Sequence, residues 1–166
     1  EGAGGRVCIR DRGLRAVSPR LGSDIAVLLD EQGPPGPAIV SGLGGGIERV
    51  QPVPGEVTLV CPPFGCPTGA VYKAYDGAPV GLREADVRAL ASAPPDPQRL
   101  FNDLAAPAGR VEPRLEELRV YLEGVLGLPV HVSGSGSTLM VIGSEGASER
   151  ARLAAPSCRV LPTRFV

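Results

Sequence analysis

The sequence predicts an α+β domain in which an antiparallel sheet of about four strands is covered by helices on one face. Short apolar segments and amphipathic segments follow one another without the strict alternation that a parallel sheet requires. The 23 glycines and 18 prolines separate apolar segments instead of forming long tracts, which indicates turns. The chain has 166 residues, of which 43% are hydrophobic, so it can bury a core. Valine, leucine and alanine must supply that core because aromatic residues are scarce.

Strand candidates dominate the first part of the chain. The apolar run at 25–29 is typical of a buried strand. Three further strands are expected at 38–41, 47–50 and 57–61, and the Pro and Gly residues between them favour antiparallel neighbours. The glycine-rich segment 42–46 resembles a phosphate loop, but two prolines and β-branched residues follow it. A phosphate loop opens a helix, so this segment is interpreted as a hairpin turn.

Helices are expected mainly in the second half. The strongest spans 113–126, where Pro113 suits the first helical position and Gly127 is a natural stop. Its apolar face is expected to comprise Leu115, Leu118, Leu122, Val125 and Leu126. Shorter helices are expected at 82–93, 100–106 and 148–155, and the remaining strands at 130–132, 138–142 and 158–161.

Composition and charge argue against several functions. The net charge is −1 with no basic stripe, so nucleic-acid binding is not favoured. No apolar stretch approaches the ~20 residues of a membrane span and no leader is evident, so no membrane partner and a cytoplasmic location are expected. The four cysteines, Cys8, Cys61, Cys66 and Cys158, form no CxxC pair, so reduced thiols and no metal site are expected. The single His131, between two valines, is interpreted as structural.

The loop Ser133-Gly134-Ser135-Gly136-Ser137 is the strongest functional candidate, because it lies between two apolar strands where a flexible linker would be out of place. Its glycines permit positive φ, and successive N–H groups can then converge on phosphate oxygens. An ordinary hairpin loop is the alternative.

Three other segments carry candidate side chains. Asp24, at the mouth of an apolar run, could accept a hydroxyl proton during phosphoryl transfer, although a helix cap or Asx turn is the commoner role. Thr68 and Tyr72 follow the strand at 57–61, either as a binding loop or as a proline-rich turn that starts a helix. Asn102 and Asp103 could cap a helix or face a site, with capping the expected role of Asp103.

Four segments in this order resemble the GHMP kinases, named for galactokinase, homoserine, mevalonate and phosphomevalonate kinases, and among them the 4-diphosphocytidyl-2-C-methyl-D-erythritol kinases. They are Leu-Gly-Ser-Asp-Ile (21–25), Pro-Pro-Phe-Gly-Cys-Pro-Thr to Val-Tyr (62–72), Phe-Asn-Asp-Leu (101–104) and Val-Ser-Gly-Ser-Gly-Ser-Thr (132–138). The resemblance implies that residues 14–166 form the ferredoxin-like C-terminal domain of this family, with the catalytic-aspartate segment at its start. Residues 1–13 form a lead segment that matches nothing in the family.

The resemblance also implies an activity: ATP, with Mg²⁺, phosphorylates a hydroxyl of the methylerythritol unit in non-mevalonate isoprenoid precursor synthesis. Asp24 matches the aspartate that deprotonates this hydroxyl, and the loop 133–137 matches the motif beside the nucleotide phosphates and the substrate. Tyr72 matches an aromatic position that stacks on the cytosine, and Thr68 lies in the same substrate-facing loop. Asn102 falls in a motif whose role is partly structural.

The sequence also departs from the family. The family carries a lysine and a glycine-rich phosphate loop, and neither precedes Asp24 here; Ile25-Ala26 stands where the family has a hydrophobic residue and proline. The expectation is therefore the C-terminal portion of a kinase, with the N-terminal kinase domain as its missing partner, and little or no activity for these 166 residues alone. The alternatives are a non-catalytic binding module that keeps the fold, or a homoserine or mevalonate type of GHMP kinase.

Overall fold

The structure is a computed structural model that describes residues 36–41, 46–51, 55–76, 84–91, 96–143 and 145–165. The chain divides into two units, residues 1–52 and residues 53–166. In the first unit, strands β1 (Ala38–Ser41) and β2 (Gly46–Arg49) pair antiparallel, with Ala38 opposite Arg49. Residues 42–45 lie outside the described part, but a strand follows them. This confirms that the glycine-rich segment does not open a helix.

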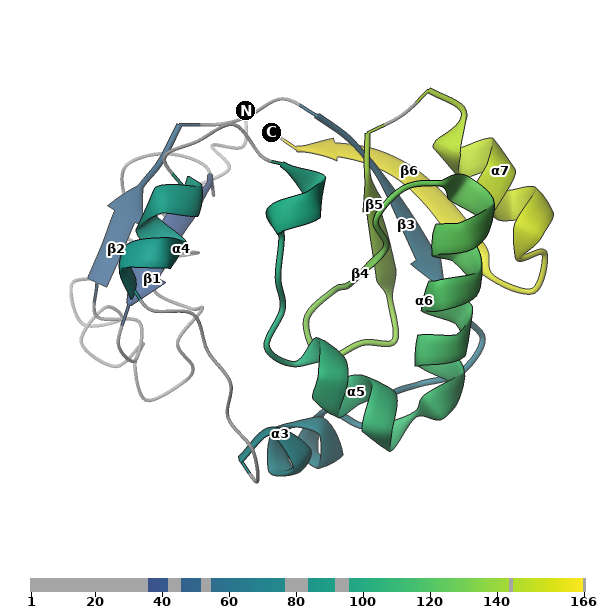
Figure 1. Cartoon of the computed structure of the whole chain (residues 1–166), viewed down its shortest axis with the longest axis horizontal. Coiled ribbons are helices and arrows are strands. Elements are labelled where there is room, and N and C mark those ends of the chain that lie inside the picture. The colour runs from purple at the N-terminus through teal and green to yellow at the C-terminus, as the bar shows by residue number, and fades with distance from the viewer. Residues whose placement is uncertain are drawn as a thin grey trace, which may run out of the picture. The chain divides into compact units, whose positions relative to one another are not determined.

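The second unit contains a four-stranded antiparallel sheet in the order β4-β5-β3-β6. Its strands are β3 (Gly55–Cys61), β4 (His131–Val132), β5 (Leu139–Ile142) and β6 (Arg159–Phe165). Helices follow the first and third of these strands in the chain, which gives the β-α-β-β-α-β connectivity of a ferredoxin-like fold (Figure 1). The expected α+β class and the four-stranded antiparallel sheet are confirmed.

The helices of this unit are α3 (Thr68–Asp76), α4 (Glu84–Ala91), the 3₁₀ turn η1 (Pro97–Arg99), α5 (Ala105–Val111), α6 (Pro113–Leu126) and α7 (Ala147–Ala154). Helices α6 and α7 lie on the same face of the sheet (Figure 1). None of the helices in the described part of the chain is long and apolar enough to cross a membrane.

The core lies between the sheet and these two helices. Buried side chains come from every strand of the sheet and from both helices: Val60, Leu115, Leu122, Val132, Leu139, Val141, Ala151 and Val160. Helix α6 has the expected bounds, and Gly127 ends it with a φ of 64° in the left-handed region. Val125 was expected on the buried face, but it is 46% exposed, because the stripe that faces the sheet is centred on Leu115, Leu122 and Leu126.

Most of the predicted elements in the described part lie within two residues of their expected bounds. Two of them differ by more than two residues at one end or both, and both contain a proline. Strand β6 was expected to stop at Leu161 but continues through Pro162 to Phe165; β6 is an edge strand, where a missing N–H leaves no ladder bond unmade. Helix α5 begins at Ala105 instead of at Leu100, and it places Pro107 in its first turn, where the helix needs no N–H donor. Residues 103 and 104 before it form a turn, and Asn102 donates to the Val132 carbonyl of β4.

Candidate functional site

The glycine loop, residues 133–137, connects β4 to β5. Ser133 N–H donates to the Thr138 carbonyl at 2.9 Å, and Gly136 N–H donates back to the Ser133 carbonyl at 3.0 Å. Gly134 and Gly136 both have positive φ, at 57° and 84°. Within the described residues, the N–H groups of Gly134 and Ser135 have no hydrogen-bond acceptor. The loop can therefore offer two adjacent donors to an anion.

Gly136 is also required by packing. A Cβ atom at this position would lie 2.9 Å from Leu115 Cδ2 and 3.4 Å from Cys66 Cβ. Leu115 is fully buried, so the side chain has little room to retreat. A Cβ atom at Gly134 would meet nothing within 4 Å. The two glycines thus differ: Gly136 anchors the loop to the core, and Gly134 lies in open space.

The turn between β3 and α3 and the first residue of α3 lie against this loop, and each makes one hydrogen bond with it. Ser137 Oγ donates to the Phe64 carbonyl at 2.6 Å, and the hydroxyls of Thr68 and Ser135 lie 3.0 Å apart. Thr68 is the first residue of α3, so the proline-rich turn does start a helix, which was the alternative to a binding loop. The helix start places the Thr68 hydroxyl on the glycine loop, and a binding role of this segment stays a prediction.

Asn102 attaches a third segment. Its Nδ2 group donates to the carbonyls of Val132 (2.8 Å) and Gly134 (2.7 Å), and its Oδ1 accepts from Leu104 N–H at 3.0 Å. Two carbonyls can only accept, so they fix which end of the amide faces the loop. Asn102, and not Asp103 as expected, makes the hydrogen bond near the start of α5, whose N-cap residue itself has no side-chain cap.

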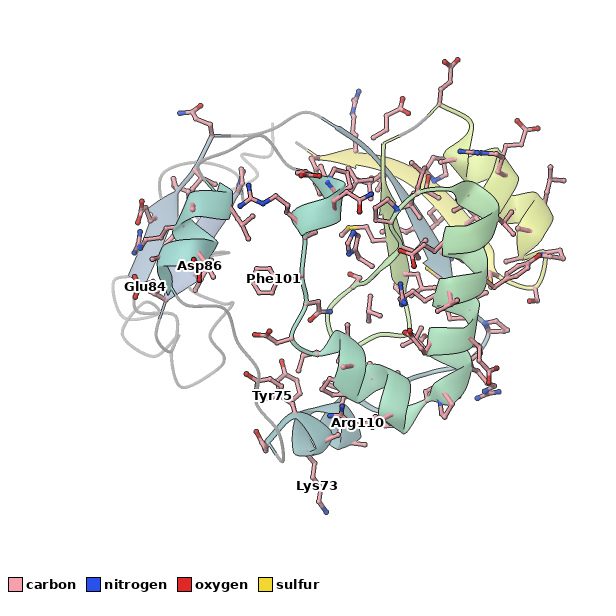
Figure 2. All side chains as sticks on the ribbon, in the orientation of Figure 1. Lys73, Tyr75, Glu84, Asp86, Phe101 and Arg110 are labelled. Atoms are coloured by element: carbon pink, nitrogen blue, oxygen red, sulfur yellow. The ribbon has the colours of Figure 1, made fainter. Side chains whose placement is uncertain are left out.

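Tyr72 lies one helical turn after Thr68 on α3, so the two side chains share a face of that helix. The Tyr72 side chain is 51% exposed, which leaves its ring accessible. Arg110 donates to the Ala74 carbonyl at 3.2 Å and so connects α5 to α3, while Lys73 points away from the body of the unit (Figure 2).

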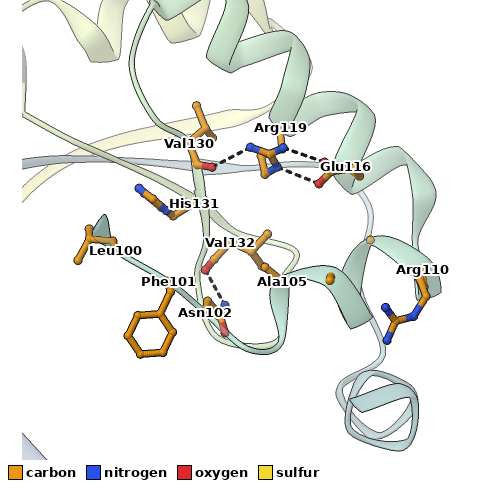
Figure 3. Close-up of a pocket in the computed structure, with 12 residues that line it drawn as sticks. Leu100, Phe101, Asn102, Ala105, Arg110, Glu116, Arg119, Val130, His131 and Val132 are labelled. Atoms are coloured by element: carbon orange, nitrogen blue, oxygen red, sulfur yellow. Dashed lines mark hydrogen bonds and ion pairs between the residues drawn. The ribbon is translucent and has the colours of Figure 1, made fainter. Parts of the chain in front are cut away.

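A groove of about 620 Å³ runs along the other side of Asn102, between the segment 100–110, β4 and α6 (Figure 3). Phe101 lies at its open side and is 45% exposed. On α6, Arg119 bonds Glu116 twice at 2.8 Å and Glu123 at 3.0 Å, and it reaches the Val130 carbonyl at 3.4 Å. The charged wall of the groove is therefore already paired.

His131 also borders this groove. Its Nε2 lies 2.9 Å from the Pro97 carbonyl, which can only accept, so Nε2 carries the proton in this contact. The bond ties η1 to the edge of the sheet, as expected of a structural histidine.

Neighbouring groups shift the pKa values of two ionisable side chains near the glycine loop, Glu112 and Cys66. The hydrogen bond from Arg114 holds the pKa of Glu112 below its ordinary value. Burial, helped by the negative charge of Glu112, raises the pKa of Cys66, whose thiol contacts the Ala108 carbonyl at 3.8 Å. Cys66 is therefore a protonated packing group at neutral pH.

Three of the four motifs singled out in the sequence come together in space: the glycine loop, the segment with Thr68 and Tyr72, and Asn102. Asp24 lies outside the described residues. The sequence did not indicate a role for Phe64, whose carbonyl accepts the hydrogen bond from Ser137. It also did not indicate a role for Glu112 and Arg114, which bond each other beside Phe64. A backbone acceptor leaves no trace in residue type, so only the contact reveals it. No group of three or more acidic, histidine or cysteine side chains that could hold a metal ion occurs among the described residues.

Comparison with known proteins gives a consistent picture, although no protein-family profile matches the chain. The 4-diphosphocytidyl-2-C-methyl-D-erythritol kinase of Caulobacter vibrioides (strain NA1000 / CB15N) is 34% identical over 168 residues, covering 86% of this chain and 52% of that kinase. The kinase of the same name from Heliobacterium modesticaldum is 32% identical over 177 residues, covering 93% and 55%.

A solved structure, that of a 4-(cytidine 5'-diphospho)-2C-methyl-D-erythritol kinase, is 26% identical with a TM-score of 0.62. The match covers 92% of this chain and 56% of that one. The chain spans about half the length of the curated relatives it matches.

Proposed function

The chain belongs to the family of 4-diphosphocytidyl-2-C-methyl-D-erythritol kinases, and we propose that it forms the part of such a kinase that holds the acceptor alcohol against the phosphates of ATP. The observation that carries this proposal is the convergence of two separate segments, one with Phe64 and Thr68 and one with Asn102, on one glycine loop. Thr68 reaches Ser135, Ser137 reaches Phe64, and Asn102 bonds Val132 and Gly134. Such a loop, held from several sides, is pre-organised for binding.

The proposed reaction moves the γ-phosphoryl group of ATP to a hydroxyl of the methylerythritol unit. The hydroxyl proton passes to the Asp24 carboxylate, a new O–P bond forms, and the bond to the β-phosphate oxygen breaks to release ADP. Asp24 is assigned as this base on the match of its segment to the family.

The donor groups of the glycine loop fit a phosphate. Gly134 and Ser135 have N–H groups with no acceptor among the described residues, and Ser133 and Ser135 in the same loop carry hydroxyl groups. Their role in the proposal is to orient phosphate oxygens and to balance charge during transfer. The described residues offer no cluster of side chains that would hold Mg²⁺ by themselves, so the ion would enter bound to ATP.

The cytidine end of the acceptor is assigned to α3. The exposed ring of Tyr72 offers a stacking face, and Thr68, on the same side of the helix, offers a hydroxyl. Stacking of a base on an aromatic side chain contributes about 1–3 kcal/mol. This contact distinguishes a cytidyl substrate from homoserine or mevalonate, which have no ring to stack.

The experiment measures transfer of phosphate from ATP to 4-diphosphocytidyl-2-C-methyl-D-erythritol by the full-length polypeptide, with phosphorylated product detected by mass spectrometry. Tyr72→Ala should raise KM for this acceptor roughly ten- to a hundredfold, while Tyr72→Phe keeps it near the parent value. Tyr75→Ala, on the same helix, is the matched control. Asp24→Asn should abolish turnover and leave acceptor binding intact.

The alternatives give different outcomes. Binding of the cytidyl acceptor without turnover would identify a non-catalytic module that keeps the fold. Turnover of homoserine or mevalonate in preference to the cytidyl acceptor would identify a different GHMP kinase. We further propose that these 166 residues alone give little or no turnover, because the relatives are about twice as long and transfer needs charges positioned on both sides of the phosphoryl group. Acceptor-dependent ATP turnover by the isolated 166 residues would contradict this.

A further inference from the structure

At the start of α6, an arginine is held by the residue two positions before it. Arg114 Nε and Nη2 donate to the two carboxylate oxygens of Glu112, at 2.8 and 2.6 Å. The Glu112 side chain is 15% exposed and also accepts from the Arg114 backbone N–H at 3.4 Å, which caps the helix. A two-pronged contact of this kind fixes the plane of the guanidinium group as well as its position.

The fixed guanidinium lies over an aromatic ring. The Arg114 Cζ atom is 4.5 Å from the centre of the Phe64 ring, within the range of a cation–π interaction. Phe64 is in the turn between β3 and α3, which has no regular backbone pairing of its own. Its side chain packs against the hydrophobic core and under Arg114, and these two contacts hold the turn in place.

The backbone of Phe64 in turn holds the glycine loop. Its carbonyl accepts the hydrogen bond from Ser137 Oγ at 2.6 Å, and Ser137 follows the packed Gly136. A chain of three contacts thus leads from Glu112 through Arg114 and Phe64 to Ser137. The last of these residues belongs to the loop that offers N–H groups to an anion.

We propose that Arg114 is a positioning residue for the glycine loop, acting through Phe64 and Ser137. The expected effect of Arg114 on the rate of phosphoryl transfer rests on the proposed function, whereas its effect on the position of the loop does not. Arg114 itself touches neither substrate nor nucleotide. It orients Phe64, whose carbonyl holds the Ser137 hydroxyl, and the N–H donors of the loop therefore keep one geometry during phosphoryl transfer. A misplaced loop lowers the rate of the chemical step more than it weakens ground-state binding.

The test is a double-mutant cycle on the full-length polypeptide. Arg114→Gln and Ser137→Ala should each lower kcat roughly three- to tenfold, as loss of one hydrogen bond of ordinary strength would, with a smaller change in KM. The double variant should lose little more than Ser137→Ala alone, because both changes break the same connection. Arg114→Lys keeps a cation over the ring and should recover part of the rate, whereas Phe64→Leu should behave like Arg114→Gln.

A second readout does not depend on activity. Amide hydrogen exchange at Gly136, whose N–H bonds Ser133, should be several-fold faster in Arg114→Gln than in the parent, and no faster still in the double variant. Arg88→Gln, which breaks an Arg–Glu pair on α4, is the matched control and should change neither kcat nor exchange at Gly136.

Two results would overturn the inference. One is additive losses of kcat in the cycle; the other is an Arg114→Gln variant that lowers thermal stability but leaves exchange at Gly136 unchanged. If the parent protein transfers no phosphate to the cytidyl acceptor, the proposed function fails separately. The exchange measurement then still decides whether Arg114 holds the loop.

Discussion

Single glycines set the geometry of the candidate site. Gly136 combines a φ of 84° with a close approach to Leu115, whereas Gly134 has a φ of 57° and open space around it. Alanine at Gly134 should cost about 1–2 kcal/mol of unfolding free energy, the usual strain of a left-handed residue. Alanine at Gly136 should cost about 1–3 kcal/mol more, because the new methyl group also overpacks the core. Urea unfolding of both variants measures the difference, and equal losses would mean that Leu115 yields without cost.

At this scale the sequence predicted residue types better than contacts. The positive φ at both glycines and the placement of Thr68 and Asn102 near the loop agree with what residue types and motif order indicated. The partner of Ser137 is a backbone carbonyl, which every residue possesses, so no pattern could have identified it. Asp103 was expected to cap a helix, but α5 has no side-chain cap, and the nearby hydrogen bond to the Leu104 N–H is made by Asn102. An amide suits this position because it can donate to two carbonyls and accept from an N–H at once.

Helix α6 carries an electrostatic prediction. Arg119 bonds Glu116, and this hydrogen bond holds the pKa of the Glu116 carboxyl below its ordinary value. The stabilisation is therefore present above the unfolded pKa of about 4.3 and is lost as the pH falls through the folded value. Because the Glu116 side chain is 49% exposed, solvent limits the effect to a fraction of about 1 kcal/mol.

The measurement is an NMR titration of the Glu116 carboxyl. Arg119→Gln should move its midpoint up toward the ordinary value and should flatten the loss of stability in acid. Arg114→Gln, on the same helix, serves as the control and should leave the Glu116 midpoint in place. An unchanged midpoint in Arg119→Gln would refute the assigned cause.

The bounds of elements were predictable where local chemistry decides them. Helix α6 has a proline at its start and a glycine at its end, and both bounds were predicted correctly. Strand β6 and helix α5 were misplaced because proline has two meanings. It ends a strand or helix in the interior of a structure, but it is tolerated on a sheet edge and in a first helical turn. Whether a strand lies at an edge depends on the sheet order, which is a property of the whole fold.

Across the molecule, thiol reactivity should report folding. Burial raises the pKa of Cys66 and of Cys158 above the ordinary thiol value, so both are mostly protonated at neutral pH. The folded state prefers the protonated thiols, so their contribution to stability is lost as the pH rises above about 8.5. Iodoacetamide at pH 7.5 should therefore label both residues more slowly in the native protein than in urea. Peptide mass spectrometry gives the two rates for each cysteine, and equal rates would contradict the assigned burial.

At this scale the class of fold followed from the sequence, but the arrangement of strands did not. Turns between apolar segments predicted antiparallel neighbours, and β1 with β2 and β4 with β5 are such pairs. Strand β3 does not join β2: it pairs with β5 and β6, which follow it by tens of residues. Those pairings arise from the shared core of the sheet and its helices, so local pattern contains no record of them. The geometry of the site also depends on this strand order, because one of its segments follows β3 and the glycine loop connects β4 to β5.

Both edge strands of the four-stranded sheet, β4 and β6, are poorly suited to pair with a further strand from another molecule. At the β4 edge, the Val130 carbonyl accepts a hydrogen bond from Arg119, and the Val130 N–H donates to Glu123. The Val132 carbonyl accepts from Asn102. At the β6 edge, Pro162 has no N–H to donate. Edge strands with unpaired backbone N–H and C=O groups are where sheets of different molecules pair and aggregate. Edges whose backbone groups are already bonded do not offer this pairing. The Asn102 amide that fixes the glycine loop thus also helps to keep the protein from aggregating.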